Sequence, residues 1–160
     1  MKNLTFALML MPAMAFAQVD LINQVADNGG DASPQFEFTT VYDIEATSVK
    51  NQSRSGTCWS YSSTSFIESE MIRMGKQPID LSEMYTVRKT YQDKADRYVR
   101  LHGNLNFSQG GALPDVLYVI KHYGAVPQAA YEGLNYGTES NDHNEMEAGL
   151  KGIVEAVVNK

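Results

Sequence analysis

The stretch from Asn51 to Gly75 constrains the fold more than any other, because a loop rich in Ser and Gly leads directly into a helix-like run. The run from Cys58 to Met74 is predicted to be a helix that ends at Gly75 as a C-cap. Its first half is rich in serine, a poor helix former in isolation, so we expect tertiary packing to hold it as a central, buried helix. Its larger apolar contacts are expected from Tyr61, Phe66, Ile67 and Met71.

The only cysteine, Cys58, stands at the start of this helix beside the only tryptophan, Trp59. A disulfide within the chain is therefore impossible, which leaves a buried inert thiol, an intermolecular link or a reactive free thiol. A helix N-terminus carries a partial positive charge and unpaired N–H groups. That field favours the thiolate, which is the nucleophilic form of cysteine.

Residues 1–17 have the pattern of a secretory signal peptide, with Lys2, an apolar run from Leu4 to Met14, and an A-x-A site at Ala15-Phe16-Ala17. The apolar run is too short to cross a bilayer. We therefore expect a secreted or periplasmic protein. Residues 18–40 are interpreted as a leader or linker, and residues 41–160 as the folded part.

The 160-residue chain has a net charge of −6 and no basic stripe, which argues against binding to nucleic acid or to an anionic membrane surface. Its length suits one domain or part of a larger one. No group of His, Cys and Asp has the spacing of metal ligands, so we expect neither a metal nor another cofactor.

Composition and periodicity predict one strand and three further helices. Residues Phe36 to Ile44 are rich in β-branched and aromatic side chains and favour a short strand or extended segment. The helices are expected from an N-cap at Asp80 to about residue 103, from Pro114 to Gly124, and from a capping-box start at Asp142 onward. The last one has a wide apolar stripe, which we expect another part of the protein to cover. The stripe consists of Met146, Leu150, Ile153, Val154, Val157 and Val158.

The residues around Cys58 carry a resemblance to a known family. Gln52 lies six residues before Cys58, a Ser-Gly pair precedes the cysteine, and Trp59 follows it. This spacing resembles that of the papain-like cysteine peptidases, whose local signature is C-G-[SA]-C-[WY]. Further segments follow in the family's order, namely Val49–Gln52, Ile67–Glu68, Leu81–Glu83, Gly110–Gly111 and Tyr123–Pro127.

The departures from papain resemble the bleomycin hydrolase and aminopeptidase C branch of that family. Papain-type enzymes carry a disulfide whose two positions here are Ser55 and Ser108. The segment from Leu81 to Gly110 is longer than in papain, and the region before the domain is too short for the usual propeptide. The resemblance implies a homohexamer, whereas the signal peptide is unusual for a mostly cytosolic branch.

The resemblance implies an α+β papain-like fold, of which this chain is mainly the α-helical (left) subdomain around a central helix. It implies that Cys58 attacks a peptide carbonyl and that the Gln52 amide and the Cys58 N–H stabilise the oxyanion. Gly110 and Gly111 would offer their backbone to an extended peptide substrate, and Trp59 would pack beside the catalytic imidazole. Glu68 is expected to be a structural carboxylate.

The family's catalytic His and Asn follow the cysteine by about 130–150 residues, which falls beyond Lys160. His102, His122 and His143 do not have the expected neighbours and are interpreted as surface or structural residues. We therefore expect that the β half with the His and Asn is absent and that the chain alone is inactive. The main prediction is an aminopeptidase; the alternatives are a papain-like endopeptidase and a non-catalytic binding module.

Overall fold

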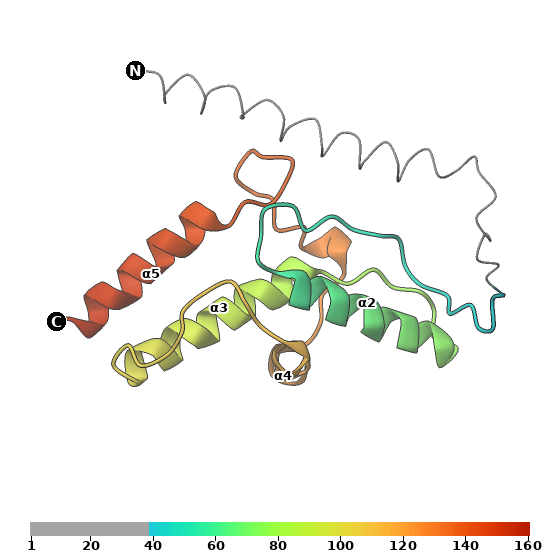
Figure 1. Cartoon of the computed structure of the whole chain (residues 1–160), viewed down its shortest axis with the longest axis horizontal. Coiled ribbons are helices and arrows are strands. Elements are labelled where there is room, and N and C mark those ends of the chain that lie inside the picture. Colours follow the sequence, from blue (N-terminus) through green and yellow to red (C-terminus); the bar gives the residue numbers. More distant parts are fainter. Residues whose placement is uncertain (1–38) are drawn as a thin grey trace, which may run out of the picture. The chain divides into compact units, whose positions relative to one another are not determined.

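The computed structural model describes residues 39–160, which contain four α-helices and a short 3₁₀ turn (Figure 1). They are α2 (Cys58–Arg73), α3 (Glu83–Arg100), α4 (Leu113–Tyr123), η1 (Gln128–Ala130) and α5 (Asn144–Val158). The chain divides into two units, residues 1–42 and 43–160. In the first unit only residues 39–42 are described, and they form neither helix nor strand. The predicted signal peptide and nearly all of the predicted leader lie outside the described residues.

The core of the second unit forms around α3, which packs against α2, α4 and α5. Figure 1 shows α4 end-on below α2 and α3, so it crosses their direction. The rings of Tyr91 and Tyr98, both on α3, contact Phe107 with centroids 5.7 and 6.0 Å away. The expectation of α2 as the central helix is therefore only partly met, because α3 has the most helical neighbours. The buried cluster consists of Trp59, Met84, Val87, Tyr91, Tyr98, Phe107, Val116 and Val154.

Helix α2 buries its tryptophan together with several small polar side chains. Trp59, Ser60, Ser63, Thr64 and Glu68 face the interior. They recur at helical spacing, which places them on one side of the helix. The prediction that Phe66 is a main apolar contact is wrong, since Phe66 is 57% exposed. Small residues on the buried side let the neighbouring backbone approach closely.

Two helix starts differ from the prediction. Helix α3 begins after Ser82, whose hydroxyl accepts a hydrogen bond from the Tyr85 N–H at 3.0 Å. Asp80, the expected N-cap, instead pairs with Lys50. Helix α5 has His143 rather than Asp142 at its N-cap position, without a side-chain capping bond.

The remaining predictions for the helices hold, whereas the predicted strand or extended segment from Phe36 to Ile44 forms no strand over its described residues. Helix α4 has Pro114 in its first turn and Gly124 as its C-cap, and Gly75 takes a left-handed φ of 75° just after α2. No strand forms in residues 39–44, and only two isolated bridges occur between residues 39 and 160. The described part of the chain is thus mainly helical and agrees with the expected helical subdomain.

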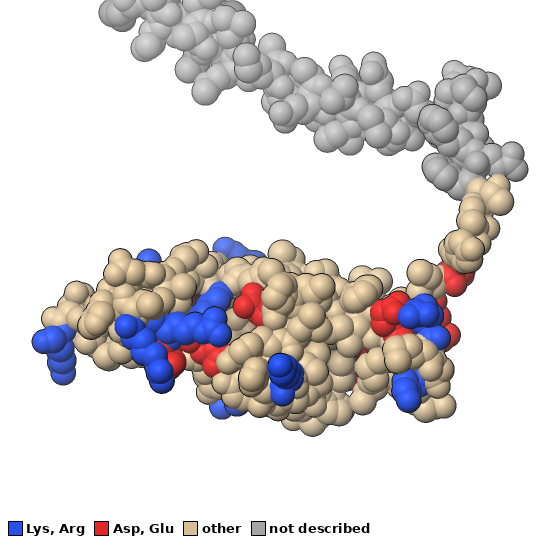
Figure 2. Space-filling model, turned by 90° about the horizontal axis from the view of Figure 1, so that it is seen from below, with Lys and Arg blue, Asp and Glu red and all other residues tan. Residues whose placement is uncertain are grey.

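Much of the apolar stripe of α5 is exposed, as the sequence suggests, with Ile153 62% and Val157 53% accessible. Next to it, α3 and α5 line an apolar cavity of about 350 Å³ that does not include Cys58. On the face seen in Figure 2, basic and acidic side chains form small groups within mostly uncharged surface. Within residues 39–160, no helix is both long and apolar enough to span a bilayer.

Candidate active site

Cys58 is the first residue of α2, and its side chain is exposed. The N-cap residue before it, Thr57, is fully buried and provides no side-chain capping bond. Among residues 39–160, neither the Cys58 N–H nor its Sγ has a hydrogen-bond partner. The thiol therefore lies at a helix N-terminus with an open backbone donor beside it, which is a site that attracts negative charge.

A tight turn before α2 holds Gln52. Its Nε2 donates to the Ser55 carbonyl, and the Ser55 hydroxyl donates back to the Gln52 carbonyl, both at 2.8 Å. The residue after Gln52, Ser53, takes a left-handed φ of 54°, which allows the chain to reverse. The Ser55 hydroxyl also lies 2.6 Å from the Thr57 hydroxyl. These bonds fix the half-buried Gln52 to the segment that leads into Cys58.

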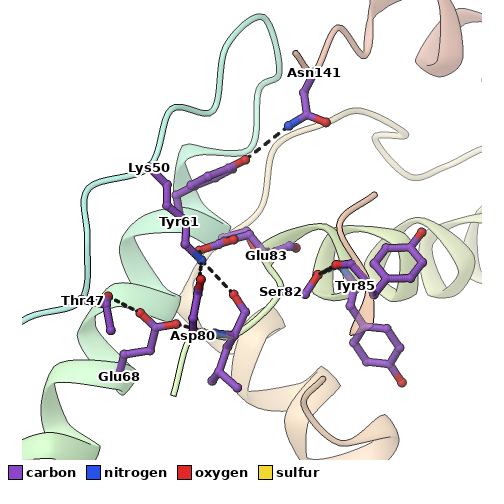
Figure 3. Close-up of polar contacts among 12 residues, drawn as sticks. Thr47, Lys50, Tyr61, Glu68, Asp80, Ser82, Glu83, Tyr85 and Asn141 are labelled. Carbon is purple, nitrogen blue, oxygen red and sulfur yellow. Dashed lines mark hydrogen bonds and ion pairs between the residues drawn. The ribbon is translucent and has the colours of Figure 1, made fainter. Parts of the chain in front are cut away.

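The segment before Gln52 is anchored by Lys50, which reaches the loop at the start of α3 (Figure 3). Its Nζ donates to the Leu81 carbonyl at 3.0 Å and to Glu83 Oε1 at 2.8 Å, and it pairs with Asp80. Burial acts to lower the pKa of Lys50, but its hydrogen bonds to Asp80 and Glu83 outweigh this and raise the pKa above 10.5. Burial of Glu83 raises the pKa of its carboxyl despite the bond from Lys50.

Glu68 holds the same region from α2, which confirms its expected structural role. Its carboxylate is 2% exposed and accepts hydrogen bonds from the Thr47 hydroxyl and from the Leu81 N–H, the latter at 2.7 Å (Figure 3). On the other side of the turn, the Arg54 N–H donates to the Asn141 carbonyl at 3.0 Å. The loop that carries Gln52 is therefore tied to α2, to the start of α3 and to the segment before α5.

The loop with Gly110 and Gly111 lies against Trp59. The indole Nε1 donates to the Gln109 carbonyl at 2.9 Å, and a Cβ built on Gly111 would lie only 2.6 Å from Trp59 Cε2. A Cβ on Gly110 would meet nothing closer than the Ser108 hydroxyl at 3.9 Å. Both glycines are exposed, while Trp59 is 7% exposed. Trp59 therefore supports the glycine loop from beneath, and its packing requires glycine at position 111.

Three further residues that the sequence patterns did not identify hold this loop. Lys94 of α3 donates to the Ser108 carbonyl at 2.8 Å and also to the Gly110 carbonyl. Glu147 of α5 accepts from the Gln109 N–H at 3.1 Å. Gln109 directly precedes the glycine pair. Lys94 and Glu147, in contrast, each lie in a helix that contains several other charged residues. Nothing in their spacing distinguishes them.

None of the three histidines is hydrogen-bonded to Cys58 Sγ within residues 39–160. His102 is exposed after α3, and His122 is exposed on α4 with its ring 4.2 Å from that of Tyr118. His143 is 5% exposed, and its Nδ1 has no hydrogen-bond partner in the described part of the chain. Burial lowers the pKa of His143 below 6.5, although nearby Asp142 acts in the opposite direction.

The described residues bring the predicted site together in part. Gln52 and Cys58 flank one hydrogen-bonded turn, and Trp59 carries the glycine loop to the same end of α2. No three potential metal ligands gather between residues 39 and 160. The arrangement thus offers a thiol, open backbone donors and an accessible strip of glycine backbone.

Comparison with known proteins places this arrangement in a family. The family model described as papain family cysteine protease matches residues 33–155, which covers nearly all of the described helices. The comparison with curated proteins finds no match. A match over most of the chain is specific enough to assign the family, and it implies cysteine peptidase activity at that level. The chain belongs to the papain family of cysteine proteases.

Proposed function

We propose that Cys58 is the nucleophile of this peptidase and that Gln52 and the Cys58 N–H form its oxyanion hole. The observation that carries the proposal is the exposed thiol at the first residue of α2, with the next residue, Trp59, supporting an open glycine loop. A thiolate there attacks the peptide carbonyl carbon and forms an acyl-enzyme, while the amine leaves. The thiol, the donors and the peptide-binding strip meet at one helix end.

The donors suit a developing oxyanion. The Gln52 amide has two N–H bonds, and the bond to the Ser55 carbonyl uses one of them, so the other is free to face the substrate. The Cys58 N–H has no partner among residues 39–160. A donor placed in this way contributes about 3 kcal/mol to transition-state stabilisation.

The substrate in this proposal is a peptide that pairs in extended form with the glycine loop. The Gly111 N–H and carbonyl have no hydrogen-bond partners in residues 39–160, whereas Lys94 already binds the Gly110 carbonyl. Pairing of main-chain groups gives affinity without depending on the peptide sequence. Gly111 is therefore the expected point of pairing.

We further propose that the general base and the Asn that orients it are not among the described residues. The chain alone is then expected not to hydrolyse peptide substrates. Support comes from the three histidines, none of which is hydrogen-bonded to Cys58 Sγ. Aminoacyl-coumarin substrates provide the test, and no release of coumarin is expected. Turnover that disappears in Cys58→Ser would contradict this part of the proposal.

Within the family, we propose an exported aminopeptidase of the bleomycin hydrolase type, which implies a hexamer. The support is the order of motifs and the pair Ser55 and Ser108 at the disulfide positions. An endopeptidase cleaves peptides whose N-terminus is blocked, whereas an aminopeptidase requires a free N-terminus. Substrates with free and with acetylated N-termini therefore distinguish the two in a protein that also has the catalytic His and Asn. A non-catalytic binding module remains the second candidate, because Cys58 lacks a histidine partner in the described part.

The nucleophile and the binding of a peptide to the glycine loop can be tested without the general base. Two chromogenic probes react with Cys58 by thiol–disulfide exchange, one a pyridyl disulfide on an extended peptide and the other the same disulfide without the peptide. We call the rate constant of the first divided by that of the second the templating ratio. Two backbone hydrogen bonds of about 0.7 kcal/mol each correspond to a ratio of roughly ten. A ratio of one would refute the proposed peptide site.

A further inference from the structure

Gln109 forms hydrogen bonds through its N–H, its carbonyl and its side-chain oxygen, and each bond goes to a different segment. Its N–H donates to Glu147 on α5 at 3.1 Å, and its carbonyl accepts from Trp59 on α2 at 2.9 Å. Its side-chain Oε1 accepts from the Gly56 N–H at 2.6 Å. Gly56 lies two residues before Cys58, so this last bond links the glycine loop to the loop that leads into α2 and the thiol.

Lys94 fixes the backbone on both sides of Gln109. Its ammonium group donates to the carbonyls of Ser108 and Gly110, the residues immediately before and after. Burial lowers the pKa of Lys94, while the carboxylates of Asp115 and Glu147 favour its charged form. The backbone of Gln109 is therefore held from α2, α3 and α5, and its side chain is the part that remains to reach Gly56.

No disulfide can join these two loops, because Cys58 is the only cysteine. Ser55 precedes Gly56 and Ser108 precedes Gln109, but the hydroxyls of these two serines bond to other residues. The Ser55 hydroxyl bonds to Gln52 and Thr57, and that of Ser108 accepts from Asn106 at 3.2 Å. The bond from Gly56 to Gln109 Oε1 is thus the direct polar connection between the loops among residues 39–160.

We propose that Gln109 is a positioning residue that sets the distance and register between Cys58 and the peptide-binding backbone of Gly111. A peptide paired with Gly111 presents its carbonyl carbon to Sγ only if the two loops keep a fixed separation. The Gln109 side chain, fixed at its own backbone and bonded to Gly56 at its tip, provides that separation. This inference rests on the proposed function and adds a residue to the same site.

Two substitutions of Gln109 by side chains of similar length separate the effect of the hydrogen bond to Gly56 from the effect of packing. Gln109→Met keeps the volume but removes the acceptor, whereas Gln109→Glu keeps an oxygen acceptor for Gly56. We expect Gln109→Met to lower the templating ratio at least fivefold while the rate with the small disulfide stays within twofold of wild type. Gln109→Glu is expected to restore the ratio to within twofold. A merely structural role would change both rates together and leave the ratio unchanged.

The outcomes separate this inference from the proposed function. A wild-type ratio well above one together with an unchanged ratio in Gln109→Met would overturn the role of Gln109 alone. That role is also overturned if Gln109→Glu lowers the ratio as much as Gln109→Met does. A wild-type ratio of one would overturn the proposed peptide site and this inference with it.

Hydrogen exchange on the wild-type chain gives a measurement that needs no variant to fold. The Gly56 N–H is expected to exchange more slowly than the Gly110 N–H, which has no partner in the described residues. Equal exchange at both amides would show that the bond to Gln109 does not persist in solution and would overturn the inference.

Discussion

Replacing Gly111 with alanine puts a methyl group against the buried indole ring of Trp59. The added Cβ would lie 2.6, 2.7 and 2.9 Å from Cε2, Cδ2 and Cζ2 of Trp59. The indole is 7% exposed and is fixed by its hydrogen bond to the Gln109 carbonyl. Either the glycine loop shifts outward or the ring moves and weakens that bond.

The expected cost follows from these two alternatives. Overpacking of this kind typically destabilises by about 1–3 kcal/mol, and loss of the indole hydrogen bond adds about 1 kcal/mol. We expect Gly111→Ala to lower the free energy of unfolding by about 2–3 kcal/mol. Gly110→Ala is the matched control, because its Cβ meets only the Ser108 hydroxyl at 3.9 Å. Its effect should stay within about 0.5 kcal/mol.

Urea unfolding followed by fluorescence measures both variants directly, because Trp59 is the only tryptophan and lies at the perturbed contact. The midpoint should move in Gly111→Ala at an unchanged slope, which identifies a change of stability. Equal free energies for Gly110→Ala and Gly111→Ala would refute the close contact between the glycine loop and the indole.

Further predictions concern the buried charged and titratable groups. Glu68→Gln should lower the free energy of unfolding by about 1–3 kcal/mol in urea, because the 2% exposed carboxylate accepts two hydrogen bonds; the same loss in Glu70→Gln would argue against this. Because burial places the folded-state pKa of His143 below the unfolded value of 6.5, its contribution to stability is complete above pH 6.5 and is lost as the pH falls through the folded value. His143→Asn should reduce this loss of stability at acid pH. A pKa of His143 at or above 6.5, measured by NMR titration, would contradict the prediction. The raised pKa of Lys50 contributes stability below pH 10.5 that is lost as the pH rises through the folded value, so the advantage of wild type over Lys50→Met should shrink there; an advantage independent of pH would contradict the ion pairs with Glu83 and Asp80.

Local sequence signals were enough to place the thiol at a helix start. The boundaries of α4 followed from Pro114 and Gly124, whose backbone preferences act within one or two residues. Cys58 begins α2 as expected, because the preceding Ser-Gly loop cannot continue a helix. These features depend on short-range conformational preferences, which the sequence contains.

Features that depend on distant residues could not be predicted in the same way. Asp80 and Ser82 are both good N-caps, and Ser82 caps α3 while the Asp80 carboxylate pairs with Lys50, thirty residues away in the chain. Phe66 is exposed although it is apolar, because the side of α2 that faces α3 and α4 is set by packing with those helices and not by the apolar character of one residue. The bonds of Gln109 come from three separate segments, so no local pattern contains them.

The proposed site requires that the folded chain brings a peptide on the glycine loop to the Cys58 thiol. The templating ratio of the wild-type chain, measured first in buffer and then in a urea concentration that unfolds it, tests this requirement. We predict a ratio of roughly ten in buffer, from two backbone hydrogen bonds, and a ratio of about one in urea. The same ratio under both conditions would contradict the proposed site, because the peptide would then gain nothing from the fold around Cys58.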